Sequence, residues 1–207
     1  MQGTPFSFGG LTGRVAGILH RRMSQDFLVL CSNHDPANRL PHQQVHKTVC
    51  WYDTAPPVRG LDIADLDITV VHREQNMVCA LVEMEDIADR PKTIIGDAAA
   101  TLIGRRLSYQ SGSGHVYLKV DRWTVLMVLA ARKGDPNHGR LGYLQQMVNA
   151  LHAGLRTQNS IAGSAANAAL GQVVLGTFGL GLDEETLAQE LADDIEREAR
   201  RSADRRR

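Results

Sequence analysis

Three carboxylates stand at the ends of two neighbouring apolar runs. Asp67 opens the β-branched run DITVV, and Glu83 and Glu85 lie at the end of the run that starts at Met77. Side chains two apart in a strand share a face, so Glu83 and Glu85 are expected to point the same way. The polar turn HREQN between the runs predicts an antiparallel hairpin that brings Asp67 beside them.

The register of this hairpin decides how close the carboxylates come. Pairing Val71 with Met77 would place Asp67 opposite Leu81, one step on the same face from Glu83. Asp67 and Glu83 could then share one cation.

Carboxylates that share a face, Asp65 before the strand included, repel one another and resist loss of water. A divalent cation resolves this repulsion. Mg²⁺ prefers oxygen ligands and keeps several waters, so two or three carboxylates suffice. A bound ion of this kind can activate water against a phosphate. The alternative is a set of solvated residues at the edge of a strand.

The stretch from LDITVV through LVEME to the segment PKTIIGD, residues 61–107, resembles the PD-(D/E)xK restriction-endonuclease-like superfamily. The resemblance rests on an acidic residue that opens one strand, about sixteen positions before an E-x-E that closes the next. It implies that Asp67 and Glu83 are metal ligands. Glu85 falls where lysine is commonest, and implies either a third ligand or a group that orients water.

Lys92, at the start of the next expected helix, could supply the missing ammonium, because the lysine migrates in this superfamily. An exposed lysine in a first helical turn after Pro91 is the simpler interpretation. The resemblance implies a nuclease dependent on Mg²⁺ or Mn²⁺ that hydrolyses phosphodiester bonds, with DNA as the expected substrate. The alternative function is a non-catalytic module that binds nucleic acid or a protein partner and keeps the nuclease-like fold.

A second group of potential ligands lies between residues 31 and 50. Two pairs have zinc-like spacing, Cys31 with His34 and His42 with His46, and Cys50 follows. No paired C-x2-C is present, and both cysteines adjoin apolar runs. Buried cysteines and solvated histidines are therefore the favoured interpretation, and no zinc is expected here.

The pattern of apolar residues predicts an α/β protein. The resemblance implies that its fold is a restriction-endonuclease-like mixed sheet flanked by helices. The continuous apolar run of residues 77–85 is typical of a central strand, beside a strand over 61–71 and under a helix over 91–107. The remaining expectations are helices over 11–24 and 141–155, strands over 27–31, 48–52, 116–120 and 124–131, and a loop over 108–114.

Residues 1–156 are expected to form the nuclease-like domain, and 157–207 a helical C-terminal tail. The segment 157–181 is rich in small residues and predicts a linker, a small-residue helix or a weak strand at 173–175. A helix is expected over 183–207. Its stripe of Leu187, Leu191 and Ile195 is narrow, so it should dock lightly or pair with another helix.

The 207 residues hold 23 basic and 23 acidic side chains, so net charge favours no class of partner. A local basic groove and a homodimer both stay open. No apolar run approaches the ~20 residues of a membrane span, and the first residues lack the pattern of a signal peptide. A cytoplasmic protein without a membrane partner is the expectation.

Overall fold

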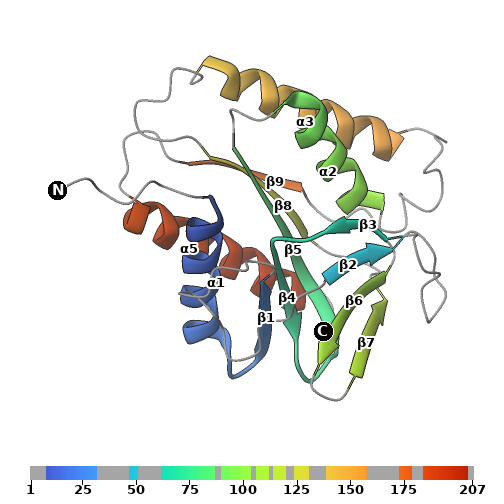
Figure 1. Ribbon diagram of the computed structural model, residues 1–207, viewed down its shortest axis with the longest axis vertical. Coiled ribbons are helices and arrows are strands. Elements are labelled where there is room, and N and C mark those ends of the chain that lie inside the picture. Colours follow the sequence, from blue (N-terminus) through green and yellow to red (C-terminus); the bar gives the residue numbers. More distant parts are fainter. Residues whose placement is uncertain are drawn as a thin grey trace.

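The computed structural model describes residues 8–31, 47–50, 62–86, 90–103, 106–111, 114–119, 124–130, 139–157, 173–178 and 184–204. Within them, a mixed sheet is flanked by helices and a C-terminal helix packs on it (Figure 1). The helices are α1 (Phe8–Met23), α2 (Pro91–Ile103), α3 (Leu141–Thr157) and α5 (Glu184–Asp204). None of these helices is both long and apolar enough to cross a membrane.

The central sheet has the strand order β1-β4-β5-β8-β9. Three antiparallel strands occupy one side, and β8 and β9 continue the sheet parallel to β5. A parallel neighbour needs a crossover connection, and α2 lies between β5 and β8 in the chain. The strands are β1 (Phe27–Cys31), β4 (Ile68–His72), β5 (Met77–Asp86), β8 (Thr124–Ala130) and β9 (Val173–Phe178).

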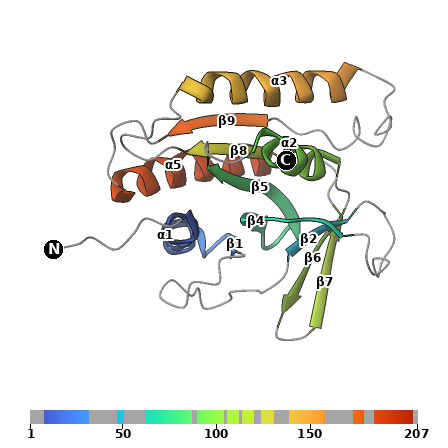
Figure 2. The ribbon, with the colours of Figure 1, turned by 45° about the horizontal axis from the view of Figure 1, so that its top comes forward.

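Helices cover both faces of the central sheet (Figure 2). On one face α1 and α5 share a core cluster with β1, β4 and β5. On the other face α2 and α3 pack, because Ile94, Ala98, Leu144 and Val148 join Leu81 in a second cluster. Strand β5, covered on both sides, is buried from Val78 to Met84. Its central position confirms the prediction from its continuous apolar run.

A second, antiparallel sheet stands beside the first, with the order β3-β2-β6-β7 (Figure 2). Leu107, Tyr109 and Leu118 from this sheet enter the core cluster under α2 and α3. The two sheets therefore share one continuous apolar layer. The strands are β2 (Lys47–Cys50), β3 (Asp62–Asp65), β6 (Arg106–Ser111) and β7 (Gly114–Lys119).

This second sheet corrects three sequence-based expectations. The single strand expected over 61–71 is two strands, β3 and β4, which belong to different sheets. Helix α2 ends at Ile103 rather than near 107, and the loop expected over 108–114 is largely the β6–β7 hairpin. The polar and small residues of that hairpin resemble a loop in composition, but cross-strand pairing overrides their weak local preference.

Of the two alternatives for the last helix, light docking is wrong, whereas pairing with another helix is confirmed, because α5 packs against α1. Leu187, Leu191 and Ile195 are buried, as the narrow stripe predicted, but small residues widen the buried face. Ala188, Ala192, Ala199 and Ala203 all lie in the core cluster with α1. Because alanine lets helix and sheet approach closely, a face poor in large side chains still packs tightly. The weak strand at 173–175 is β9, so this segment also joins the central sheet.

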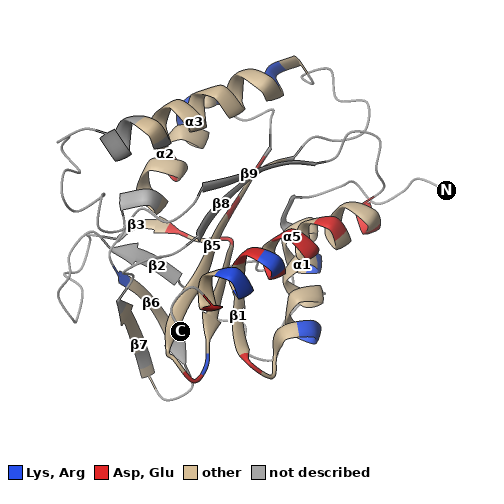
Figure 3. Ribbon diagram, turned by 180° about the vertical axis from the view of Figure 1, so that it is seen from behind, with Lys and Arg blue, Asp and Glu red and all other residues tan. Residues whose placement is uncertain are grey.

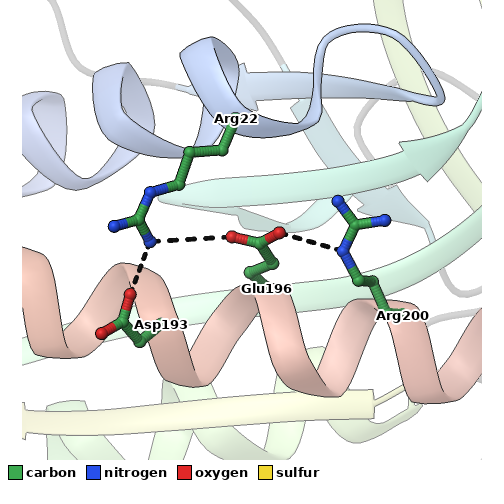
Figure 4. Close-up of polar contacts among 4 residues, drawn as sticks. All are labelled: Arg22, Asp193, Glu196 and Arg200. Atoms are coloured by element: carbon green, nitrogen blue, oxygen red, sulfur yellow. Dashed lines mark hydrogen bonds and ion pairs between the residues drawn. The ribbon is translucent and has the colours of Figure 1, made fainter.

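Ion pairs line the contact between α1 and α5. Acidic residues predominate in the first half of α5, and arginines join them in its second half (Figure 3). Arg22 of α1 binds Asp193 and Glu196, and Glu196 also accepts a hydrogen bond from Arg200 (Figure 4). These side chains are partly exposed, so each pair is worth about 0–1 kcal/mol and mainly orients the helices.

Candidate active site

The β4–β5 hairpin places Asp67 directly beside Glu83. Ile68 pairs with Val82, so Asp67, one residue before β4, is level with Glu83. The Asp67 Oδ2 atom accepts a hydrogen bond of 2.8 Å from the backbone N–H of Met84. The Asp67 side chain thereby extends the hydrogen bonding between β4 and β5 by one residue, and it is fixed near the end of β5.

This register corrects the one inferred from the sequence. Met77 pairs with His72 rather than with Val71. The register then shifts by one residue, because Val71 pairs with Val78 but Val70 pairs with Ala80. The extra residue on β5 is Cys79, which makes a β-bulge. A bulge inserts one residue without a partner and re-aims the side chains that follow it.

The bulge determines the face on which the two glutamates lie. Cys79 and Ala80, although adjacent, both contact the cluster with α1 and α5. Leu81 then contacts the opposite cluster, under α2 and α3. Regular alternation beyond Leu81 puts Glu83 and Glu85 on the α2 side of the sheet. A hairpin with an unbroken register would have placed them differently relative to Asp67.

Glu83 is almost completely enclosed, with 4% of its surface exposed. Burial raises the pKa of the Glu83 carboxyl well above its ordinary value, and the neighbouring charge of Asp67 raises it further. Glu85 and Asp97 act in the same direction, while a hydrogen bond with Thr101 partly offsets them. All the charged groups that act on Glu83 in this way are carboxylates.

Thr101 of α2 contacts the Glu83 carboxyl directly. The Thr101 hydroxyl oxygen lies 3.0 Å from Glu83 Oε1 and 2.8 Å from the backbone carbonyl oxygen of Asp97. One hydroxyl proton serves only one acceptor at a time. When Thr101 donates to the carbonyl of Asp97, a protonated Glu83 can donate to Thr101.

Helix α2 therefore supplies two residues that the sequence analysis missed, Asp97 and Thr101. They are four positions apart, so they lie on one side of the helix. Thr101 is fully buried and Asp97 half-buried. Their spacing was the available signal, but the helix could have faced the strand at another rotation.

Two other candidate residues, Lys92 and Asp65, lie away from this cluster. Lys92 is exposed in the first turn of α2. Nine residues, about two and a half turns, separate Lys92 from Thr101, so the two lie on opposite sides of the helix. Asp65 belongs to β3, pairs with Thr48 in the second sheet, and is exposed. Glu85, by contrast, is half-buried near Glu83.

One polar side chain beside the carboxylates lacks a hydrogen-bond partner. Thr69 is fully buried, and its hydroxyl makes no hydrogen bond to the described residues. Thr69 pairs with Leu81, so it lies on the same sheet face as Leu81 and Glu83. The site thus combines acidic groups with an unsatisfied hydroxyl.

The described residues include no group of three or more His, Cys, Asp or Glu side chains arranged to hold a metal ion. The acidic cluster is instead built around one pair, Asp67 with Glu83, and Glu85 and Asp97 lie near it. For the other ligand group, Cys31 is buried in the core at the end of β1 and is not part of a disulfide with a described residue. The described part of the chain excludes His34, His42 and His46, and gives Cys50 only as the last residue of β2.

Comparisons of the chain with protein-family models, curated proteins and solved structures found no match.

Proposed function

We propose that this protein is a metal-dependent nuclease that hydrolyses phosphodiester bonds, with DNA as the expected substrate. The observation that carries the proposal is the buried Glu83 carboxyl, which faces Asp67, Glu85 and Asp97, while none of the cationic side chains among the described residues acts on it. Buried charges are ordinarily paired with an opposite charge. A divalent cation bound between substrate phosphate and carboxylates would provide that charge.

The arrangement of elements supports the same proposal. Helix α1, the three antiparallel strands β1, β4 and β5, helix α2 and strand β8 follow one another along the central sheet. This helix–strand–strand–strand–helix–strand order fits the PD-(D/E)xK superfamily core, although the second sheet interrupts it in the chain. The proximity of Asp67, before β4, to Glu83, in β5, supports the pairing of acidic residues that the resemblance implies.

The donor set suits Mg²⁺ or Mn²⁺, because carboxylate oxygens are the ligands that these ions prefer. Mg²⁺ in phosphate-processing sites is commonly held by one or two carboxylates plus waters and substrate phosphates. A pair, Asp67 and Glu83, is therefore sufficient. When bound, the ion would stabilise charge on the phosphate and activate water. Glu85 would complete the ligand set or orient that water, and Lys92 remains a candidate only for a distant role.

The proposal is tested with the purified protein, mixed DNA and RNA substrates, and Mg²⁺ or Mn²⁺. Wild-type protein should cleave DNA, and Asp67→Asn should lose cleavage by at least ~100-fold because the substituted amide no longer offers a charged ligand. Asp65→Asn is the matched control: the same change, two residues away, on an exposed side chain of the other sheet. Equal activity of Asp67→Asn and Asp65→Asn would contradict the proposal.

A second candidate is a non-catalytic module that binds nucleic acid or a protein partner through the same fold. Two observations favour it: the described residues hold no three-ligand metal group, and Lys92 lies on the far side of α2 from Thr101. Titration calorimetry with Mn²⁺ separates the candidates. Absence of both metal binding and cleavage in the wild-type protein would favour the non-catalytic module.

A further inference from the structure

A cavity of about 220 Å³ lies at the end of the central sheet remote from the carboxylates. It is formed where the α1–β1 turn, the β4–β5 turn and the last turns of α5 meet. His72 at one end of β4 lines it, whereas Asp67 precedes the other end, roughly 16 Å along the strand. The cavity is therefore separate from the proposed active site.

The inner wall of the cavity carries His72, of which 6% is exposed. Its Nδ1 atom accepts a hydrogen bond of 3.3 Å from the backbone N–H of Gln75. Because Nδ1 accepts this hydrogen bond, a neutral imidazole carries its proton on Nε2. The ring packs edge-on against Phe27, with centroids 5.1 Å apart. The wall of the cavity thus holds the His72 ring in a fixed orientation.

Arg200 of α5 provides further donors in the same cavity. Its Nε atom donates a hydrogen bond of 2.9 Å to Glu196, and its guanidinium carbon lies 5.5 Å from the centre of the Phe27 ring. The two Nη groups point away from Glu196 in Figure 4, and they make no hydrogen bond to described residues. The side chains of His72 and Arg200 both pack on Phe27, which holds them in place. Their N–H groups are therefore positioned to donate to an acceptor in the cavity.

Carboxylates surround these donors at the opening of the cavity. Asp26, Glu74 and Asp204 come from three different elements, and all three are exposed. Three carboxylates against one guanidinium make the cavity acidic, which disfavours phosphate and other multiply charged anions. The complementary molecule has one carboxylate for the inner donors and ammonium groups for the rim.

We propose that this cavity binds a small basic amino acid, with its carboxylate on His72 and Arg200 and its ammonium groups against the rim carboxylates. Charge-assisted hydrogen bonds at both ends would fix its orientation. The described cavity has room for a molecule of this size, since a few hundred cubic ångströms is typical of small-ligand sites.

Titration calorimetry of the full chain with L-lysine, cadaverine and glutarate tests the proposal. Cadaverine keeps two ammonium groups but lacks the carboxylate, and glutarate has carboxylates without ammonium. L-lysine should bind at least ~10-fold more tightly than either, because only it satisfies both sets of groups. No binding of L-lysine, or equal binding of cadaverine or glutarate, would overturn the proposal.

Two variants locate the binding. Glu74→Gln, on the exposed β4–β5 turn, should weaken L-lysine binding several-fold without affecting the fold. Glu190→Gln makes the same change on an exposed α5 residue outside the cavity and should leave binding unchanged. Circular dichroism confirms folding of both. If L-lysine binds both variants as it binds the wild type, it binds elsewhere and the proposed site is wrong.

Discussion

Glu83 is an acidic side chain in a place that almost excludes water. Because burial and Asp67 raise its pKa, the folded protein holds the proton at pH values where the unfolded chain has released it. The unfolded carboxyl titrates near 4.5. As pH rises through the interval between that value and the raised folded pKa, the free energy of unfolding of the metal-free protein falls.

Glu83→Gln should therefore stabilise the metal-free protein at pH 8, because glutamine cannot ionise and can still donate to Thr101. A gain of about 1 kcal/mol corresponds to a rise in Tm of roughly 2–4 °C for a chain of this size. The gain should shrink as pH falls through 4.5, because below that value both states of the wild type are largely protonated. Thermal denaturation from pH 4 to 8 measures it, with Glu190→Gln as the exposed control. A gain that shrinks as pH rises would contradict the assigned pKa direction.

Thr101→Val keeps the shape of the side chain and removes the hydroxyl from Glu83. A buried carboxyl left without its hydrogen bond should cost about 1–3 kcal/mol of stability. Thr101→Ser keeps the hydroxyl and should cost less. Urea denaturation of the two variants compares them directly. Equal losses would mean that the methyl packing of Thr101, rather than its hydroxyl, stabilises this part of α2.

The sequence allowed prediction of Glu83 and Glu85 on one sheet face and of Asp67 near them, because alternation along a strand is regular. The bulge at Cys79 was not predictable, since any residue of that apolar run could carry it. The contribution of Asp97 and Thr101 to the site was also not predictable from the sequence. Their contact with Glu83 depends on the rotation of α2 about its axis, which is set by how Ile94 and Ala98 pack.

Helix α5 is a structural part of the core, so damage to its buried face should be costly. Leu191 is fully buried against α1 and the central sheet. Leu191→Ala should lower the free energy of unfolding by about 3 kcal/mol, within the usual range for buried leucines. Glu190→Ala, on the adjacent exposed position, should change it by less than ~0.5 kcal/mol. Urea denaturation that gives similar values for both would show that α5 docks weakly.

The contribution of α5 was underestimated because alanines carry little weight in an apolar pattern. Four buried alanines widen the stripe marked by Leu187, Leu191 and Ile195. The second sheet was missed for another reason. Its pairs, such as Thr48 with Asp65 and Val49 with Leu107, join segments far apart in the chain, and short polar strands give little local signal.

The two sheets should unfold together, because one apolar layer joins them. Leu107, Tyr109 and Leu118 of the second sheet lie in the same core cluster as Leu81 and the helices of the first. Native-state hydrogen exchange should therefore give similar opening free energies for the slowest amides of β5 and β6. If the β6 amides exchange through a separate, lower-energy opening, the second sheet is an independent unit.

The pairing of α1 with α5 also bears on how the protein is made. Leu11, Val15 and Leu19 are covered in part by a helix that begins about 160 residues after α1 ends. At a translation rate of about 5–20 residues per second, the apolar side of α1 waits roughly 10–30 s on the ribosome before its partner is synthesised. The nascent chain is thus a natural client for chaperones that shield apolar surface, and slowed synthesis would lengthen its exposure to aggregation.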